Sequence, residues 1–319
     1  MELLKALESI RFPALNWIMQ AITSCGEELV FMAVALILFW CVDKWKGYYV
    51  LAVGFLGTLC SQFLKLLCRI PRPWVRDPSF TVVESAQRGA TGYSFPSGHA
   101  QNAACTFGGI ARASKRRALR AALVVLTLLI GFSRLYLGAH DLADVGVGLL
   151  IGLVLVFALY PLLRRAKESP GVMYGFLAVL TLLSLGNLAH LLWADFPDEV
   201  RVVDPLTGIS NYDEALKNGC TLLGCLAGLI VAYTVDLRKL HFYEAPQLPG
   251  QVCKVVLGMA ALIGLRYGLS ALFKSGLLPA FQGQHGWSAL RYFLMVVFAG
   301  AVWPVTFRFW QTIGAQTRH

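Results

Sequence analysis

Two histidines in this chain stand in short polar stretches that interrupt otherwise apolar sequence. His99 follows the tripeptide Pro-Ser-Gly, and His140 is followed by Asp144 one helical turn later. A carboxylate at that spacing lies within reach of an imidazole N–H, where it fixes the tautomer and leaves the other ring nitrogen free to attack. A second histidine can exchange a proton with a leaving group. The pair therefore indicates nucleophilic and acid–base chemistry.

Groups suited to an anion surround these histidines in the sequence. Ser97 and Gly98 offer a hydroxyl and an unhindered amide at the start of a small-residue helix, which are the parts of an anion cradle. Arg134 ends an apolar run, and three more cations at i, i+4 and i+7 would share one helix face: Lys65, Arg69 and Arg72. Together these groups suit a dianionic phosphate and the extra charge of its transition state.

Each of these features also has a simpler explanation. Basic residues at a helix end can snorkel to the interface, a serine can cap a helix, and a His-x-x-x-Asp pair is often structural. A zinc site is a further alternative, with these candidate ligands: His99, His140, Asp141 and Asp144. The nearby cations would repel a divalent ion, so we expect neither a metal nor another cofactor. The conjunction of the motifs favours phosphate chemistry.

Apolar sequence makes up most of the elements that must position these residues. Of 319 residues, 57% are hydrophobic and only 14% charged, against about 25% charged in soluble domains. This composition excludes a soluble enzyme, a disordered tail and a nucleic-acid binder. A membrane span needs about 20 apolar residues, and the apolar runs fall near 28–42, 49–68, 98–113, 118–137, 141–163, 171–193, 216–235, 252–273 and 287–310. We therefore predict an all-α, polytopic helical membrane protein with about nine transmembrane helices.

Three regions follow from this pattern. Residues 1–24 read as an interfacial amphipathic helix, because apolar residues recur at helical spacing among charged ones. Residues 25–165 form the predicted catalytic helical core, and 166–319 form four additional transmembrane helices. The weakest span, 98–113, is small and polar, which suits a helix buried among other helices. Arg266 lies in the middle of a later span, where a charge marks either a functional group or a structural pair.

The loops predict the orientation of the chain. The short basic connections all fall on one side if 43–48 is cytoplasmic, and the acidic 194–214 loop then falls on the other. This places the N-terminus outside and the C-terminus in the cytoplasm. The motif-bearing loops 69–97 and 134–140 both open outside. We therefore expect a multi-pass protein, of the cell membrane, with an extracytoplasmic site.

Three motifs occur in order in the first half of the chain. They are Lys65-x6-Arg72-Pro73, Pro96-Ser97-Gly98-His99 and Ser133-Arg134-x5-His140-x3-Asp144. They resemble the three signature motifs of the type 2 phosphatidic acid phosphatase (PAP2) superfamily, without departure at any signature position. The resemblance covers roughly residues 25–163 and implies a helical membrane phosphatase.

The resemblance also implies a role for each signature residue. His140 would be the nucleophile that forms a phosphohistidine, Asp144 would orient it, and His99 would protonate the leaving alcohol. The phosphoryl oxygens would be held without a metal by Lys65, Arg72, Arg134, Ser97 and the Gly98 amide. Three further residues are candidates for contact with the substrate although they are not signature positions: Arg69, Tyr136 and Trp74.

A lipid phosphate or lipid diphosphate is the favoured substrate, because a site between helix ends can admit a headgroup while its tail stays in the bilayer. Isoprenyl diphosphate, phosphatidate, phosphatidylglycerol phosphate and sphingoid phosphate all fit this description. The alternatives are a sugar phosphatase similar to glucose-6-phosphatase, a lipid phosphotransferase, and a non-catalytic scaffold or transporter on the same fold. Membrane lipids are the expected partners, with no nucleic acid, and no oligomeric state is predicted.

Overall fold

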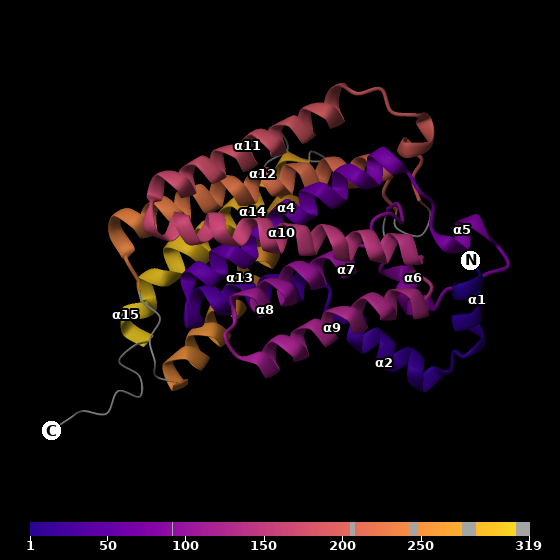
Figure 1. The fold of residues 1–319 in the computed structure, drawn as a ribbon. Helices are drawn as coiled ribbons and strands as arrows, with labels where there is room; N and C mark the ends of the chain where they lie inside the picture. The colour runs from indigo at the N-terminus through magenta and orange to yellow at the C-terminus, as the bar shows by residue number, and fades with distance from the viewer. Residues whose placement is uncertain (91, 205–207, 243–247, 276–284, 311–319) are drawn as a thin grey trace. The chain divides into compact units, whose positions relative to one another are not determined.

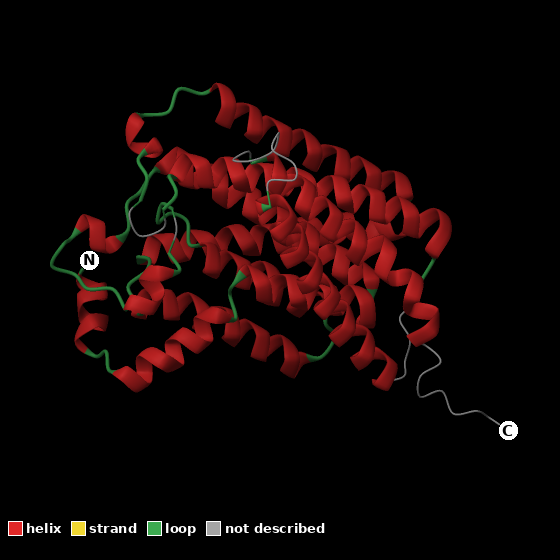
Figure 2. Ribbon diagram, turned by 180° about the vertical axis from the view of Figure 1, so that it is seen from behind, coloured by secondary structure: helices red, strands yellow, loops and turns green. Residues whose placement is uncertain are grey.

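All regular elements of the described chain are helices. The computed structural model describes residues 1–90, 92–204, 208–242, 248–275 and 285–310, and no strand occurs within these ranges (Figures 1 and 2). The α-helices are α1 (Glu2–Ser9), α2 (Pro13–Ser24), α3 (Glu28–Ile37), α4 (Lys44–Cys68), α5 (Pro73–Arg76), α6 (Glu84–Arg88), α7 (Gly98–Ala103), α8 (Gly109–Ala113), α9 (Arg117–Tyr136), α10 (Leu142–Glu168), α11 (Pro170–Trp193), α12 (Asn211–Val235), α13 (Leu248–Lys274), α14 (Gly286–Val297) and α15 (Phe307–Trp310). The predicted all-α class is confirmed.

Seven helical segments in the described ranges are long and apolar enough to cross a membrane. They are Lys44–Arg76, Arg117–Tyr136, Leu142–Glu168, Pro170–Trp193, Asn211–Leu240, Leu248–Phe273 and Gly286–Trp310. An eighth span is formed if Pro13–Ser24 and Glu28–Val42, which meet at a bend of 48°, are taken as one. The protein is therefore an integral membrane protein, close to the nine spans expected.

The predicted span at 98–113 accounts for part of the difference in number. It consists of α7, a π-helical turn (Ala104–Gly108) and α8, and it packs against α9 and α10. Close approach depends on small residues of α10. A Cβ added at Gly148 would lie 2.6 Å from the Ser97 carbonyl oxygen, and one at Gly152 would lie 2.5 Å from Ala104 Cβ. The segment is thus a short helix enclosed by longer ones, and it fixes the position of Ser97.

The chain divides into two compact units. The first comprises residues 1–35, 48–168 and 194–215, and it contains all three signature motifs. The second comprises 36–47, 169–193 and the described part of 216–319. The segment 194–215 therefore packs with the motif-bearing helices although it follows them by more than twenty residues in the sequence. The division of the chain at residues 24 and 165 stays a prediction.

The N-terminal helices pack against the motif-bearing unit. Leu4 and Leu7 of α1 are buried in one cluster with Phe80 and Leu135. α2 lies along α9 (Figure 1). The apolar face of α1 is thus covered by protein, and its placement at a membrane interface stays a prediction.

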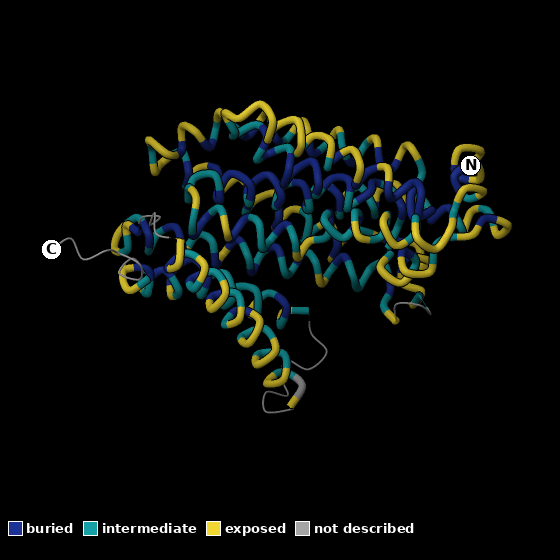
Figure 3. The backbone as a smooth tube through the Cα atoms, turned by 90° about the horizontal axis from the view of Figure 1, so that it is seen from below, coloured by how far each residue is buried: buried dark blue, intermediate teal, exposed yellow. Residues whose placement is uncertain are grey.

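Helix α9 presents two different faces. Its exposed side is apolar and includes Val125, Leu128 and Phe132, whereas Ile130 and Arg134 are buried on the other side. Figure 3 shows the same pattern in other helices, where exposed and buried positions alternate along the backbone. An apolar exposed face suits lipid contact, so α9 turns Arg134 away from the bilayer and into the protein.

Candidate active site

The first motif is split between two helices. α4 ends at Cys68, three residues after Lys65, and Arg69 follows in the left-handed region with φ of 51° and an exposed side chain. Arg72 precedes α5 and is buried. The expectation that the three cations share one helix face is therefore wrong. The prolines at 71 and 73 explain why, because proline removes a backbone donor and disfavours helical conformation in the residue before it.

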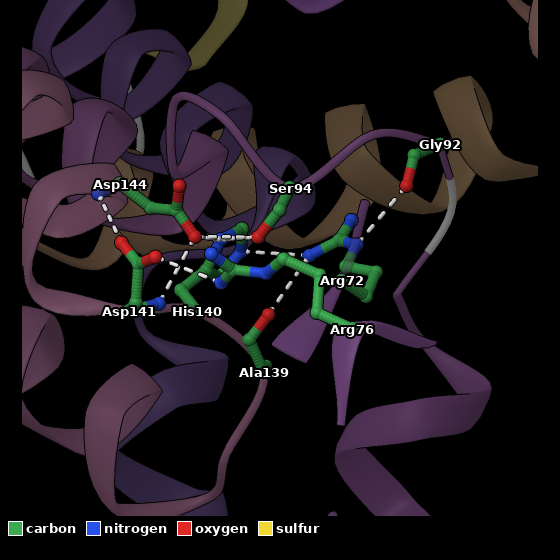
Figure 4. A network of polar contacts seen from close by, with 8 residues as sticks. All are labelled: Arg72, Arg76, Gly92, Ser94, Ala139, His140, Asp141 and Asp144. Atoms are coloured by element: carbon green, nitrogen blue, oxygen red, sulfur yellow. Dashed lines mark hydrogen bonds and ion pairs between the residues drawn. The ribbon is translucent and has the colours of Figure 1, made fainter. Parts of the chain in front are cut away.

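His140 lies between a cation and a carboxylate (Figure 4). Its Nε2 is 3.0 Å from Arg72 Nη1, and its Nδ1 is 3.4 Å from Asp144 Oδ2. A guanidinium can only donate, so Nε2 must accept through its lone pair and Nδ1 must carry the proton. This is the tautomer in which Asp144 holds the imidazole from behind while Nε2 is nucleophilic.

Asp144 is itself held by several hydrogen bonds. Ser94 Oγ donates to Asp144 Oδ2, and the backbone N–H of Asp141 donates to the same oxygen at 2.9 Å. In return, Asp141 Oδ1 accepts the backbone N–H of Asp144 at 2.9 Å, while Arg76 forms an ion pair with Asp141 Oδ2 at 2.8 Å (Figure 4). The carboxylate behind His140 is therefore fixed at the start of α10. The sequence did not indicate that Ser94 and Arg76 would hold this carboxylate pair.

Arg72 joins three separate parts of the site. Its Nε donates to the Gly92 carbonyl at 3.0 Å, and its Nη1 donates to the Ala139 carbonyl at 3.2 Å as well as facing His140. The ring of Trp74 lies 5.9 Å from the guanidinium carbon, within cation–π range. Trp74, one of the candidate substrate contacts, thus lies beside Arg72.

Two buried polar groups point to a ligand. Within the described residues, Ser97 Oγ and Arg134 Nε have no hydrogen-bond partner. Arg134 is otherwise held by Thr23 of α2, whose Oγ1 accepts from Nη1 at 3.0 Å. The Ser97 N–H donates to the Asp144 carbonyl at 2.9 Å, which joins the second motif to the third. Buried donors are costly to leave unpaired, so these two are suited to the oxygens of a bound anion.

The site is strongly electropositive. His140 feels the charges of Arg72, Arg134 and Lys65, and it also interacts with His99. Burial, reinforced by these cations, holds the pKa of His140 well below the usual histidine value. The imidazole is therefore neutral near pH 7. The structure thus brings residues of all three motifs together around one imidazole.

Other polar residues near the site have different surroundings. Burial raises the pKa of Asp141, but hydrogen bonds from the Asp144 N–H and from Arg76 outweigh it and leave that pKa below its usual value. Tyr136 is fully buried, and its hydroxyl donates to Asn16 at 2.9 Å. This contact gives Tyr136 a packing role between α9 and α2. Among the described residues, no three His, Cys, Asp or Glu side chains form a group that could hold a metal ion.

Membrane helices that gather a histidine–aspartate pair and three cations at one buried place define the class of integral membrane phosphatases. The comparisons with known proteins identify the family. Residues 45–168 match the PAP2 superfamily, and residues 220–315 match the PAP2 superfamily phosphatase transmembrane extension. The chain belongs to the PAP2 superfamily.

One curated relative supports this assignment. Phosphatidylglycerophosphatase B of Bacillus subtilis (strain 168) is 34% identical over 166 residues, which cover 48% of this chain and 77% of the relative. No solved structure matches the chain. The relative is a lipid phosphatase by its name, and the chain is a phosphatase of the same superfamily.

Proposed function

We propose that this protein hydrolyses a lipid phosphate at an extracytoplasmic site through a phosphohistidine on His140. One observation carries the proposal: the Nε2 lone pair faces the cation Arg72, while Asp144 lies behind the protonated Nδ1. A neutral imidazole held in this way is prepared to attack an anion that the cation attracts.

The proposed steps use the roles that the family resemblance implies for the signature residues. Lys65, Arg72, Arg134, Ser97 Oγ and the Gly98 amide bind the phosphoryl oxygens. His140 Nε2 donates its electron pair to phosphorus, in line with the ester bond, whose electrons leave with the alcohol oxygen. His99 gives that oxygen a proton. A water molecule then loses a proton to His99 and attacks phosphorus, which releases phosphate and restores neutral His140. No step needs a metal.

A lipid with an alcohol headgroup is the proposed substrate. The relative named above acts, by its name, on phosphatidylglycerophosphate, and the apolar exposed faces of helices such as α9 suit lipid around the site. We therefore take phosphatidylglycerophosphate as the first substrate to test. Glucose 6-phosphate and transfer of labelled phosphate to an acceptor lipid are the comparison assays, because they separate the sugar phosphatase and phosphotransferase alternatives.

Trapping the intermediate tests the proposal directly. Purified protein mixed briefly with 32P-labelled phosphatidylglycerophosphate and quenched in alkali should carry label on His140, since phosphohistidine survives base and not acid. His140→Ala should lose the label and release phosphate at least about a thousand-fold more slowly, because the nucleophile is gone. His190→Ala in α11 is the matched control and should be labelled normally. Phosphate release by His140→Ala at the normal rate would refute the mechanism.

A further inference from the structure

A small cavity lies beside the site and is lined from three separate stretches of the first unit. Its polar and glycine lining consists of Gln62, Lys65, Gly92, Tyr93, Asn211 and Glu214. Lys65 belongs to the first motif, whereas Asn211 and Glu214 come from the first turn of α12, outside the span of all three motifs. The cavity thus shares a wall with the phosphate site and adds groups that no motif supplies.

The contacts of Arg72 show that this cavity lies close to the nucleophile. One end of its guanidinium group, Nε, donates to the Gly92 carbonyl at 3.0 Å, and another nitrogen, Nη1, lies 3.0 Å from His140 Nε2. Gly92 lines the cavity. A single guanidinium group therefore separates the cavity wall from the attacking nitrogen, so a short substituent on a bound phosphate can reach the cavity.

Oxygen atoms of α12 converge with Lys65 at Gly92. A Cβ added to Gly92 would lie 3.2 Å from Glu214 Oε2, 3.6 Å from Asn211 Oδ1 and 3.9 Å from Lys65 Nζ. The φ of Gly92 is +66°, a conformation that other residues rarely adopt. Glycine therefore brings the backbone close to a carboxylate, an amide oxygen and an ammonium group at one corner of the cavity.

The chemistry of this corner selects what can enter. A carboxylate next to the phosphate site repels a second anionic group such as the outer phosphate of a diphosphate. The same carboxylate and the amide of Asn211 accept hydrogen bonds from hydroxyl groups, and Gln62 and Tyr93 add further donors and acceptors. These properties match a neutral, hydroxyl-bearing alcohol of the glycerol type.

We propose that this cavity binds the hydroxyl group next to the phosphate ester and that Glu214 and Asn211 determine the preference for such monoesters. The proposal rests on the proposed function, because phosphate must occupy the site of Lys65 and Arg72. In phosphatidylglycerophosphate the glycerol that carries the terminal phosphate keeps a free hydroxyl, whereas in phosphatidate both neighbouring oxygens are acylated. Glu214 and Asn211 are specificity-determining residues in this view.

Two soluble probes isolate the hydroxyl contact. Glycerol 3-phosphate and n-propyl phosphate differ only in hydroxyl groups, and each can compete with p-nitrophenyl phosphate hydrolysis. For the wild type we expect glycerol 3-phosphate to inhibit about ten-fold more strongly, as one hydrogen bond to a charged group provides. Glu214→Leu should bring this ratio near one and Glu214→Gln should give an intermediate value. If a Glu214 substitution also changes phosphate binding by Lys65, it affects both inhibitors equally, and this change cancels in the ratio.

Inorganic pyrophosphate provides the opposite test. Both Glu214 variants should bind pyrophosphate more tightly relative to inorganic phosphate, because the repelling carboxylate is gone. Asn211→Ala, as an independent variant, should lower the glycerol ratio and leave the pyrophosphate ratio unchanged. Asp198→Asn removes an exposed carboxylate of the same segment and should change neither ratio. Glycerol ratios in Glu214→Leu and Asn211→Ala equal to that of the wild type, together with an unchanged pyrophosphate ratio in Glu214→Leu, would overturn the proposal.

Lipid assays separate failure of the cavity from failure of the proposed function. We expect kcat/KM for phosphatidylglycerophosphate to exceed that for phosphatidate, and Glu214→Leu to reduce the difference about ten-fold. If neither lipid is hydrolysed while the glycerol ratio holds, the lipid function fails and the cavity assignment stands. If both lipids are hydrolysed equally well and the glycerol ratio is near one, the phosphatase stands and the cavity assignment fails.

Discussion

His140 is an imidazole whose neutral form is enforced by its neighbours. Burial and the cations Arg72, Arg134 and Lys65 all disfavour a proton on the ring, while Asp144 retains the one on Nδ1. A free histidine would be largely protonated at pH 5 and unable to attack. The surrounding charges therefore extend the pH range in which the nucleophile is active.

Removing one cation should make this effect visible. In Arg134→Gln the pKa of His140 should rise toward its usual value, because a charge that opposed protonation is lost. When the pH is lowered, the variant therefore reaches its protonated, inactive form sooner than the wild type does. The acid limb of kcat/KM should shift to higher pH by about one unit. The measurement is the pH profile of the variant, normalised to its own maximum, since weaker phosphate binding lowers the whole curve.

A control variant separates this effect from a change in net charge. Arg116→Gln also removes one cation, but Arg116 is exposed in the connection before α9. Its acid limb should coincide with that of the wild type. An acid limb in Arg134→Gln that stays in place or moves to lower pH would contradict the assigned influence of Arg134 on His140.

At the level of elements, the site is assembled from chain reversals at helix ends. The turn between α9 and α10 carries His140, and it is tightened at Gly138, whose φ is +81°. A Cβ at Gly138 would lie 2.8 Å from both Arg11 Nη2 and the Phe80 ring. Arg11 itself donates from Nε to the Tyr136 carbonyl at 2.8 Å and from Nη1 to the Thr81 carbonyl at 2.6 Å. The connection after α1 therefore supports the turn that presents the nucleophile.

Arg11→Ala tests whether this support positions His140. Two carbonyls would lose their donor, at a cost of about 1–3 kcal/mol each where they are buried. We expect kcat to fall about ten-fold with KM nearly unchanged, because the groups that bind phosphate are not touched. Arg11→Lys should restore only part of kcat, since one ammonium cannot reproduce the fork of a guanidinium group.

Another cation nearby supplies the control. Lys5 of α1 forms an ion pair with Asp77 at 2.8 Å and donates to Ser79 Oγ at 3.3 Å, and Lys5 itself is exposed. Lys5→Ala should leave both kinetic constants near wild type, as exposed ion pairs contribute little. Equal losses in Lys5→Ala and Arg11→Ala, or a loss confined to KM, would show that Arg11 does not position the turn.

Sequence alone predicted the elements better than their ends. Apolar runs gave the long helices, because a bilayer imposes length and composition on each span. The apolar run near 49–68 stops where α4 ends, but the i, i+4, i+7 spacing wrongly suggested that Arg69 and Arg72 share a helix face with Lys65. Ser94 and Glu214 were missed for a different reason. The hydrogen bond of Ser94 to Asp144 and the place of Glu214 in the cavity beside Gly92 arise from tertiary packing, and nothing in their local sequence marks them.

Considered as a whole, the chain combines a motif-bearing part with a second part of the same superfamily. The two matches, residues 45–168 and 220–315, cover a phosphatase region and a transmembrane extension. The first compact unit also takes in residues 194–215, so the segment leading into the extension contributes Asn211 and Glu214 beside the site. The residues that line the cavity therefore precede the matched extension and belong to the first compact unit, although α12 continues from them into the extension.

The orientation of the whole molecule is the remaining prediction. The basic connection 114–117 lies at one end of α9 and the turn that carries His140 lies at the other, so a spanning α9 places them on opposite sides of the membrane. Positive charge is generally retained in the cytoplasm, so we predict that the active site lies outside. Cysteine labelling in intact cells can measure this. Glu84 and Lys115 are both exposed and suit single-cysteine variants once the eight native cysteines are replaced.

A membrane-impermeant maleimide should label Glu84→Cys in intact cells, because α6 belongs to the segment between the first two motifs. It should label Lys115→Cys only after the membrane is permeabilised. Activity of each variant on an added lipid phosphate serves as the check of correct folding. The reverse labelling pattern would place the phosphate site in the cytoplasm, and its substrate would then have to come from the inner leaflet, against the charge distribution of every short basic loop.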